Sequence, residues 1–243
     1  MFACVFGGAV CGFLLNRALP PQHLSAESKD VIRISMGLVV TMAALVLGLL
    51  ISSAKSFYDT QSTELTEMSS KVILLDRLLA HYGPETKEAR DLLRATVTDG
   101  IDTIWPQERT QPSKPPAPST TGPEALIGDI QALSPENDLQ RSIQAQALSI
   151  VMGVTQTRWL MYEQGANSVS KPMLAILVFW LTAIFVSFGL FAPRNATVVT
   201  ALFIAALAVS GAILLIIDMY MPFGGLIQIS SGPLRATLTQ LGQ

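Results

Sequence analysis

The sequence contains few charged residues, and this scarcity excludes most classes of soluble protein. Asp, Glu, Lys and Arg make up 14% of the chain, whereas they make up about 25% of a typical soluble domain. Half of the residues are hydrophobic, and the net charge is -2. No basic stripe that could neutralise nucleic-acid phosphates is present. The composition therefore indicates a membrane protein and argues against a nucleic-acid partner.

Residues that bind metals or carry catalysis are also scarce. The two cysteines, Cys4 and Cys11, lie in one apolar stretch, where they pack as small hydrophobic residues. The two histidines, His23 and His81, lie in different sequence contexts, so neither a metal site nor a catalytic base is expected from them. The chain also lacks HExxH, Walker, GxSxG and dinucleotide-binding motifs. We therefore expect no metal, no cofactor and no enzymatic activity.

Four apolar stretches stand out against this background. They cover residues 1–15, 36–54, 173–192 and 196–217. An apolar helix of about 20 residues matches the roughly 30 Å hydrocarbon core of a bilayer. The first stretch is shorter than this, but all four are predicted to be transmembrane helices, with the lipid bilayer as their environment.

The polar block between the second and third stretches holds most of the charged residues and shows helical periodicity. Apolar residues recur there at alternating spacings of three and four, which is typical of a packed helical seam; they include Leu65, Met68, Val72, Leu75 and Leu79. We expect the second membrane helix to continue into this stalk as far as Gly83-Pro84. A second stalk, beginning at the Ser134-Pro135-Glu136 cap, is expected to pair with it in antiparallel fashion. The seam is interpreted as a hairpin or oligomer contact, with a ligand groove as the alternative.

These patterns predict an all-α integral membrane protein with four transmembrane helices and a long helical-hairpin extramembrane domain. The predicted segments are transmembrane helices 1 and 2 (1–54), the extramembrane domain (55–171) with a Pro-rich linker (106–123), a transmembrane hairpin (172–217) and a membrane-surface tail (218–243) ending in a short helix.

One face of the second span carries small and weakly polar side chains. Its members are Gly37, Thr41, Ala44, Gly48 and Ser52. Such strips commonly allow membrane helices to pack closely. The functional alternative is that copies of this face around a symmetry axis line a narrow pore. Four spans enclose too little space to form a pore alone, so the second interpretation requires a homo-oligomer.

Two charges lie near the ends of the spans. Lys55 follows the second span and Asp218 ends the fourth. Asp218 is interpreted either as an interfacial residue or as a pore-mouth group, and Lys55 as a positive charge at the mouth. Basic residues near the membrane number four in the short loops and five on the domain side, so they do not decide the orientation.

The chain resembles a bacterial membrane family that carries a bestrophin-like domain. Matching residues lie within 23–31, 36–49 and 188–190, and in the motifs Leu75-Asp76-Arg77, Tyr82-Gly83-Pro84-Glu85, Trp105-Pro106, Thr157-Arg158-Trp159, Pro222-Phe223-Gly224-Gly225 and Gly232-Pro233-Leu234-Arg235. The resemblance implies a distant similarity to bestrophins, which are pentameric chloride channels with cytoplasmic termini. On this basis the extramembrane domain is expected to be cytoplasmic and the protein to lie in the bacterial inner membrane. The acidic cation-binding cluster of some bestrophins is not matched here.

Two functional hypotheses follow. The first is a homo-oligomeric channel for chloride or other small anions, with the small-residue face lining the pore. The second is a non-conducting membrane scaffold or sensor, in which the stalk hairpin and the 106–123 linker bind a partner.

Overall fold

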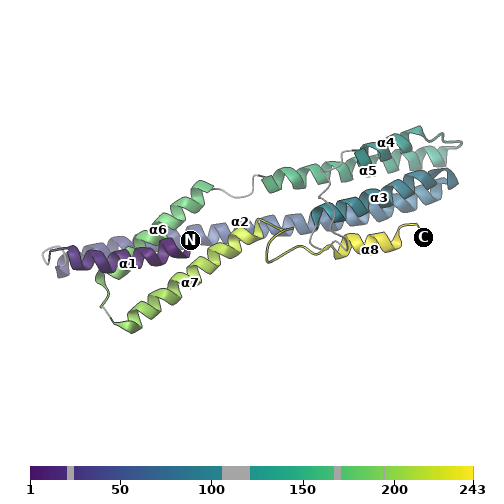
Figure 1. Ribbon diagram of the computed structural model, residues 1–243. Helices are drawn as coiled ribbons and strands as arrows, with labels where there is room; N and C mark the ends of the chain where they lie inside the picture. Colours follow the sequence, from purple (N-terminus) through teal and green to yellow (C-terminus); the bar gives the residue numbers. More distant parts are fainter. Residues whose placement is uncertain (21–24, 106–120, 167–170, 194, 243) are drawn as a thin grey trace. The chain divides into compact units, whose positions relative to one another are not determined.

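The computed structural model describes residues 1–20, 25–105, 121–166, 171–193 and 195–242. All regular elements in these ranges are helical, so the predicted all-α class is confirmed. In chain order they are α1 (Phe2–Ala18), α2 (Ala26–Tyr82), the short 3-10 helix η2 (Pro84–Thr86), α3 (Lys87–Ile104), α4 (Thr121–Ala132), α5 (Asp138–Ala166), α6 (Lys171–Phe191), α7 (Ala196–Met219) and α8 (Gly232–Gln240) (Figure 1).

The chain divides into two compact units. Unit 1 comprises Met1–Phe57 and Ser168–Tyr220, and unit 2 comprises Tyr58–Asn167 and Met221–Gln243. Each unit has its own buried apolar clusters. The C-terminal segment Met221–Gln243 belongs to the same compact unit as Tyr58–Asn167.

Three helices of unit 1 are long and apolar enough to cross a membrane: α2, α6 and α7. Helix α1 is apolar but has only 17 residues, which corresponds to about 26 Å at 1.5 Å per residue. Length and composition therefore support the second, third and fourth predicted spans. The first predicted span, α1, is not clearly shown.

Helix α1 is the main partner of α6 in unit 1, and glycine allows the two backbones to approach closely. A Cβ atom at Gly12 would collide with the carbonyl oxygen of Val186, and one at Gly189 would collide with that of Ala9. The contact register is regular, since Gly8 lies against Thr182 and the Asn16 side chain donates a hydrogen bond to the carbonyl oxygen of Leu190 (2.5 Å). The predicted hairpin of the third and fourth spans is not shown as such, because α1 packs against both α6 and α7.

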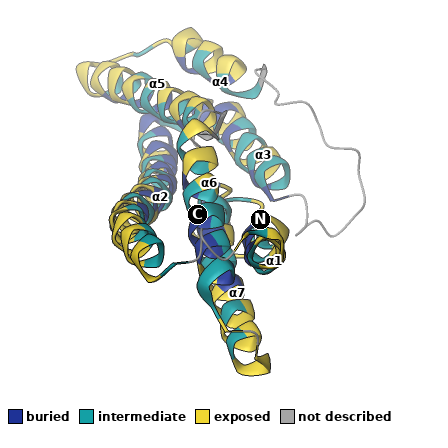
Figure 2. Ribbon diagram, turned by 90° about the vertical axis from the view of Figure 1, so that its left-hand side faces the viewer, coloured by how far each residue is buried: buried dark blue, intermediate teal, exposed yellow. Residues whose placement is uncertain are grey.

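Helix α2 is continuous over 57 residues, as the sequence predicted. Its start is capped by Ser25, whose Oγ accepts a hydrogen bond from the Ser28 N–H (3.2 Å). It ends at Tyr82. The next residue, Gly83, has a φ of 144°, a conformation that favours glycine, and Pro84 after it cannot continue the helix. Its buried apolar residues and Gln61 recur at spacings of three, four or seven within each unit (Figure 2): Ala43, Leu50 and Ala54 in unit 1, and Gln61, Leu65, Met68, Val72, Leu75, Leu79 and Tyr82 in unit 2, where Ser69 and Asp76 are buried as well.

Within unit 2, α2 and α5 are antiparallel. Gln61 Nε2 donates a hydrogen bond to Gln164 Oε1 (2.7 Å), and Gln140 Nε2 donates one to the carbonyl oxygen of Tyr82 (3.0 Å). The start of the unit 2 part of α2, at Gln61, thus meets the end of α5, and the end of α2, at Tyr82, meets the start of α5. The direction of this pairing is the one expected for the two stalks, and the wider helical-hairpin arrangement of the extramembrane domain stays a prediction.

Two local predictions in unit 2 were wrong. Helix α5 begins at Asp138, after an Asn137 cap, and not at Ser134. Asn137 Oδ1 accepts the Gln140 N–H (2.8 Å) while Gln140 Oε1 accepts the Glu136 N–H (2.8 Å), so the capping partners lie three residues further on. Helix α4 was not predicted, and its first residues belong to the range expected as linker; residues 106–120 of that range lie outside the described residues.

The C-terminal segment packs within unit 2. Trp105 Nε1 donates a hydrogen bond to the carbonyl oxygen of Ile229 (2.8 Å), and the Trp105 ring meets Phe223 edge-on with centroids 5.5 Å apart. Leu234 and Leu241 are buried in the same unit. The membrane-surface location expected for this segment stays a prediction, but the segment is not a separate body.

A buried ion pair joins α2 to α3. Arg90 donates two hydrogen bonds to Asp76, from Nε to Oδ1 (2.7 Å) and from a terminal nitrogen to Oδ2 (3.1 Å). The Gly242 N–H also donates to Oδ2 (3.3 Å). The Asp76 side chain is 2% exposed. The hydrogen bond to Asp76 raises the pKa of Arg90 above its ordinary value, so the guanidinium stays charged.

Replacing Gly12 by Ala should loosen the contact between α1 and α6. The added methyl group must displace backbone atoms of α6, and overpacking of this kind costs about 1 to 3 kcal/mol. We expect a lower melting temperature in detergent micelles, measured by circular dichroism. Gly7→Ala is the matched control, because its Cβ meets no atom within 4 Å. Equal melting temperatures for the two variants would contradict the glycine contact.

Replacing Asp76 by Asn should destabilise unit 2. The Arg90 guanidinium, 22% exposed, then lacks its negative partner, and breaking such a pair costs about 3 kcal/mol. Hydrogen exchange of the full chain in detergent micelles would report this as faster exchange of the α3 amides. Asp138→Asn removes an exposed ion pair with Arg141, in which Asp138 is 97% exposed, and should leave exchange unchanged. Similar protection in both variants would show that the buried pair adds no stability.

Candidate functional site

The small-residue strip lies on the outer side of α2 in unit 1. All five of its members are exposed, namely Gly37, Thr41, Ala44, Gly48 and Ser52. At about 100° per residue, the strip is centred on the side of the helix opposite Ala43, Leu50 and Ala54, which are buried in the core of unit 1. The strip therefore takes no part in the core of its own chain.

The strip offers main-chain and hydroxyl oxygens at its surface. No atom lies within 4 Å of a Cβ built at Gly37 or Gly48, so the helix backbone is uncovered there. The Thr41 hydroxyl donates to the carbonyl oxygen of Gly37 (3.0 Å), which leaves its lone pairs directed outward. A surface of this kind suits either close contact with another helix or contact with a partly hydrated ion.

The two mouth charges predicted from the sequence differ in their burial. Lys55 is exposed, one turn beyond Ser52 on the same side of α2, and Asp218 is half-buried in the last turn of α7. The middle of α2 and the end of α7 are joined nearby, because Tyr220 donates a hydrogen bond to Ser53 Oγ (3.0 Å) and the centroid of its ring lies 5.4 Å from that of Phe57. This contact fixes the end of the fourth predicted span beside the second.

The seam residues lie on the inner side of α2 in unit 2. Leu65, Met68, Val72, Leu75 and Leu79 are all buried. They belong to two apolar clusters that also contain residues of α3 and α5. They therefore form core contacts within one chain.

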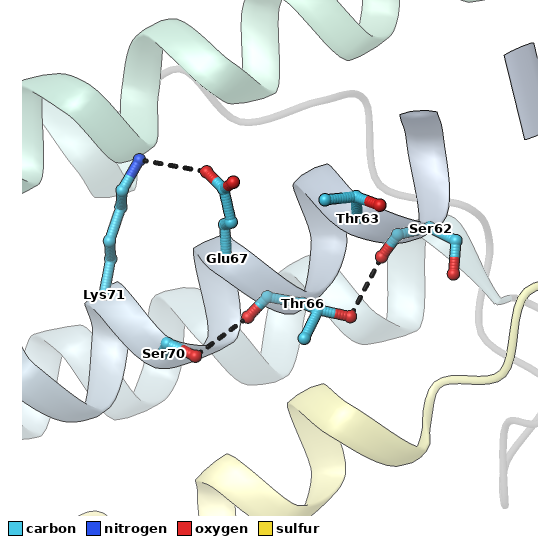
Figure 3. Close-up of a pocket in the computed structure, with 6 residues that line it drawn as sticks. All are labelled: Ser62, Thr63, Thr66, Glu67, Ser70 and Lys71. Carbon is cyan, nitrogen blue, oxygen red and sulfur yellow. Dashed lines mark hydrogen bonds and ion pairs between the residues drawn. The ribbon is translucent and has the colours of Figure 1, made fainter. Parts of the chain in front are cut away.

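A shallow depression of about 460 Å³ lies on the outer side of α2 in unit 2 (Figure 3). Its lining consists of Ser62, Thr63, Thr66, Glu67, Ser70 and Lys71, all from this one helix. Thr66 and Ser70 donate to carbonyl oxygens one turn earlier (2.9 and 3.1 Å), and Lys71 lies 3.8 Å from Glu67. Since no second element contributes, the depression is a polar helix surface and does not enclose a ligand. Ser62, Thr66 and Ser70 continue the spacing of Gly48, Ser52 and Lys55.

The described residues contain no group of three or more His, Cys, Asp and Glu side chains placed to hold a metal. Two buried polar pairs were not identified from the sequence, Asp76 with Arg90 and Gln61 with Gln164. The available signal was that Gln61 continues the spacing of the apolar seam and that Asp76 lies directly beside it, because a polar residue at or beside a buried position needs a partner.

Comparison with known proteins gives one match. Residues 3–234 match the Bestrophin-like domain family. No curated protein and no solved structure matches the chain. The match covers almost the entire chain, from the second residue of α1 to the first turn of α8, and so the chain belongs to the bestrophin-like domain family.

Proposed function

We propose that the protein is a homo-oligomeric anion channel whose pore is lined by the small-residue strip of α2. The observation that carries the proposal is the complete exposure of this strip, on the side of α2 opposite the core of unit 1. Membership in the bestrophin-like domain family supports the class of activity. The proposal includes no catalytic function and no cofactor.

A four-span arrangement is part of the proposal, in which α1 crosses the membrane together with α2, α6 and α7. Gly8 meets Thr182, Gly12 meets Val186 and Asn16 meets Leu190, so residue numbers rise together along α1 and α6. The two helices are therefore parallel. A chain that crosses the bilayer at α1, returns at α2, crosses again at α6 and returns at α7 has this relation between its first and third spans.

The exposed strip needs a partner, and a second copy of the chain supplies one. Large apolar side chains such as Leu38, Leu45 and Leu49 flank the strip and are exposed to lipid in a single copy. Surrounding an axis with several copies of α2 would cover these leucines with protein and leave the narrower strip facing the axis. Uncovered backbone at Gly37 and Gly48 and the hydroxyls of Thr41 and Ser52 would then form the wall.

Anion preference is proposed to come from polar groups and one positive charge. The strip contains no ionisable side chain between Gly37 and Ser52. Lys55 follows it and would raise the local anion concentration at the mouth. Asp218 is proposed to contribute at the same end as an interfacial or gating residue.

We propose that unit 2 is cytoplasmic and that the protein lies in the inner membrane of a bacterial cell. This follows the implied similarity to bestrophins, whose termini are cytoplasmic. The loops after α1 and α6 would then face the outside.

Replacing Gly48 by Leu should reduce chloride flux through purified protein in liposomes. The leucine side chain would fill the pore axis in every copy, so we expect flux to fall towards that of protein-free vesicles. Gly211→Leu is the matched control, because Gly211 is also exposed in a span, with no atom within 4 Å of its Cβ, but lies on α7. The oligomer mass of both variants would be recorded on the same samples.

Unchanged flux in Gly48→Leu, with flux present in the unmodified protein, would overturn the pore assignment. A well-folded oligomer without flux would instead favour the scaffold hypothesis. In that case deletion of residues 106–123 should abolish partner recovery in a pull-down experiment.

Cysteine labelling should report the orientation. In a Cys4→Ser, Cys11→Ser background, we expect Thr197→Cys, at the exposed first turn of α7, to react with a membrane-impermeant maleimide in intact cells. Ser149→Cys, on the exposed side of α5, should react only after permeabilisation. The reverse pattern would place unit 2 outside the cytoplasm.

A further inference from the structure

An aromatic patch is exposed near the end of α5. It consists of Trp159, Leu160 and Tyr162, with exposed fractions of 54%, 46% and 64%. The two rings meet edge-on, with centroids 6.2 Å apart. By contrast, Trp105 in the same unit is 2% exposed and hydrogen-bonded. The described residues of unit 2 therefore leave these three side chains largely uncovered.

The patch lies close in sequence to a membrane span. Tyr162 is nine residues before Lys171, the first residue of α6, and α5 itself continues to Ala166. The five residue steps from Ala166 to Lys171 reach at most about 18 Å. The last turns of α5 are thus tethered within a short distance of the point where α6 enters the bilayer.

The chemistry of the patch suits the membrane–water interface. Trp and Tyr concentrate there, since each combines an apolar ring with a polar atom that can face the headgroups. The ends of the spans in unit 1 carry the same kind of side chain, with Phe57 and Tyr220 in contact. Arg158 and Glu163 flank the patch with opposite charges, so its attraction to a bilayer does not depend on anionic lipid.

We infer that Trp159, Leu160 and Tyr162 insert into the interfacial region of the lipid bilayer and anchor the end of α5 at the membrane surface. This inference depends on the membrane assignment of α6 and not on channel activity. A second copy of the chain covering the patch is the competing occupant, and the test distinguishes the two.

The test uses tryptophan fluorescence of the full chain in phosphatidylcholine vesicles. The Trp180→Phe variant retains Trp105 and Trp159 and removes the indole of the α6 span. Lipid brominated near the headgroup should reduce its emission more than lipid brominated near the chain end. The matched Trp159→Phe, Trp180→Phe variant retains only buried Trp105, and its emission should be unchanged by either lipid. If Trp180→Phe folds poorly, the quenching of Trp159 is obtained by subtracting the quenching measured in the Trp159→Phe variant from that measured in the unmodified protein.

Equal emission of the Trp159 indole in brominated and ordinary lipid would overturn the inference. Aqueous iodide would then identify the alternative. Quenching by iodide would show that the patch faces water, and protection from both quenchers would show that a protein surface covers it. Either result removes the interfacial anchor, whereas selective quenching by headgroup-brominated lipid supports it.

Discussion

The unbroken hydrogen-bonded backbone of α2 is the constraint on which the other contacts depend. In an unbroken helix, only residues spaced by three, four or seven stay on one side, so each unit must draw its share of core residues from α2 at these spacings. Ala43 and Leu50 satisfy this condition in unit 1, and Leu65, Leu75 and Leu79 satisfy it in unit 2. In unit 1 the small residues of the strip stay exposed, together with large apolar residues such as Leu38, Leu45 and Leu49.

The sequence predicted the features that depend on local physical chemistry. The end of α2 before Gly83-Pro84 follows from the conformational freedom of glycine and from the inability of proline to continue a helix. The composition of the strip from Gly37 to Ser52 was equally legible, because periodicity places these residues on one side of a helix.

The sequence could not predict features for which two local structures compete, or contacts between residues that lie far apart in the sequence. Proline in the first turn of a helix is tolerated, so Pro123 was compatible with α4 as well as with a linker. Ser134 and Asn137 were both able to cap α5, and tertiary contacts of the following residues favoured Asn137. The partners Asp76 and Arg90 lie on different helices, so their pairing requires knowledge of how those helices pack. The occupant of the outer strip depends on a neighbouring molecule.

The parallel packing of α1 and α6 also has an electrostatic consequence. Each helix carries about half a positive charge at its N-terminus, from aligned peptide dipoles. In an antiparallel pair these partial charges cancel, but in α1 and α6 they point the same way and add. Neither helix has an acidic residue in its first turn to offset them. At the end of unit 1 where both helices begin, the two N-terminal partial charges therefore reinforce each other, and no carboxylate in the first turn of α1 or α6 reduces them.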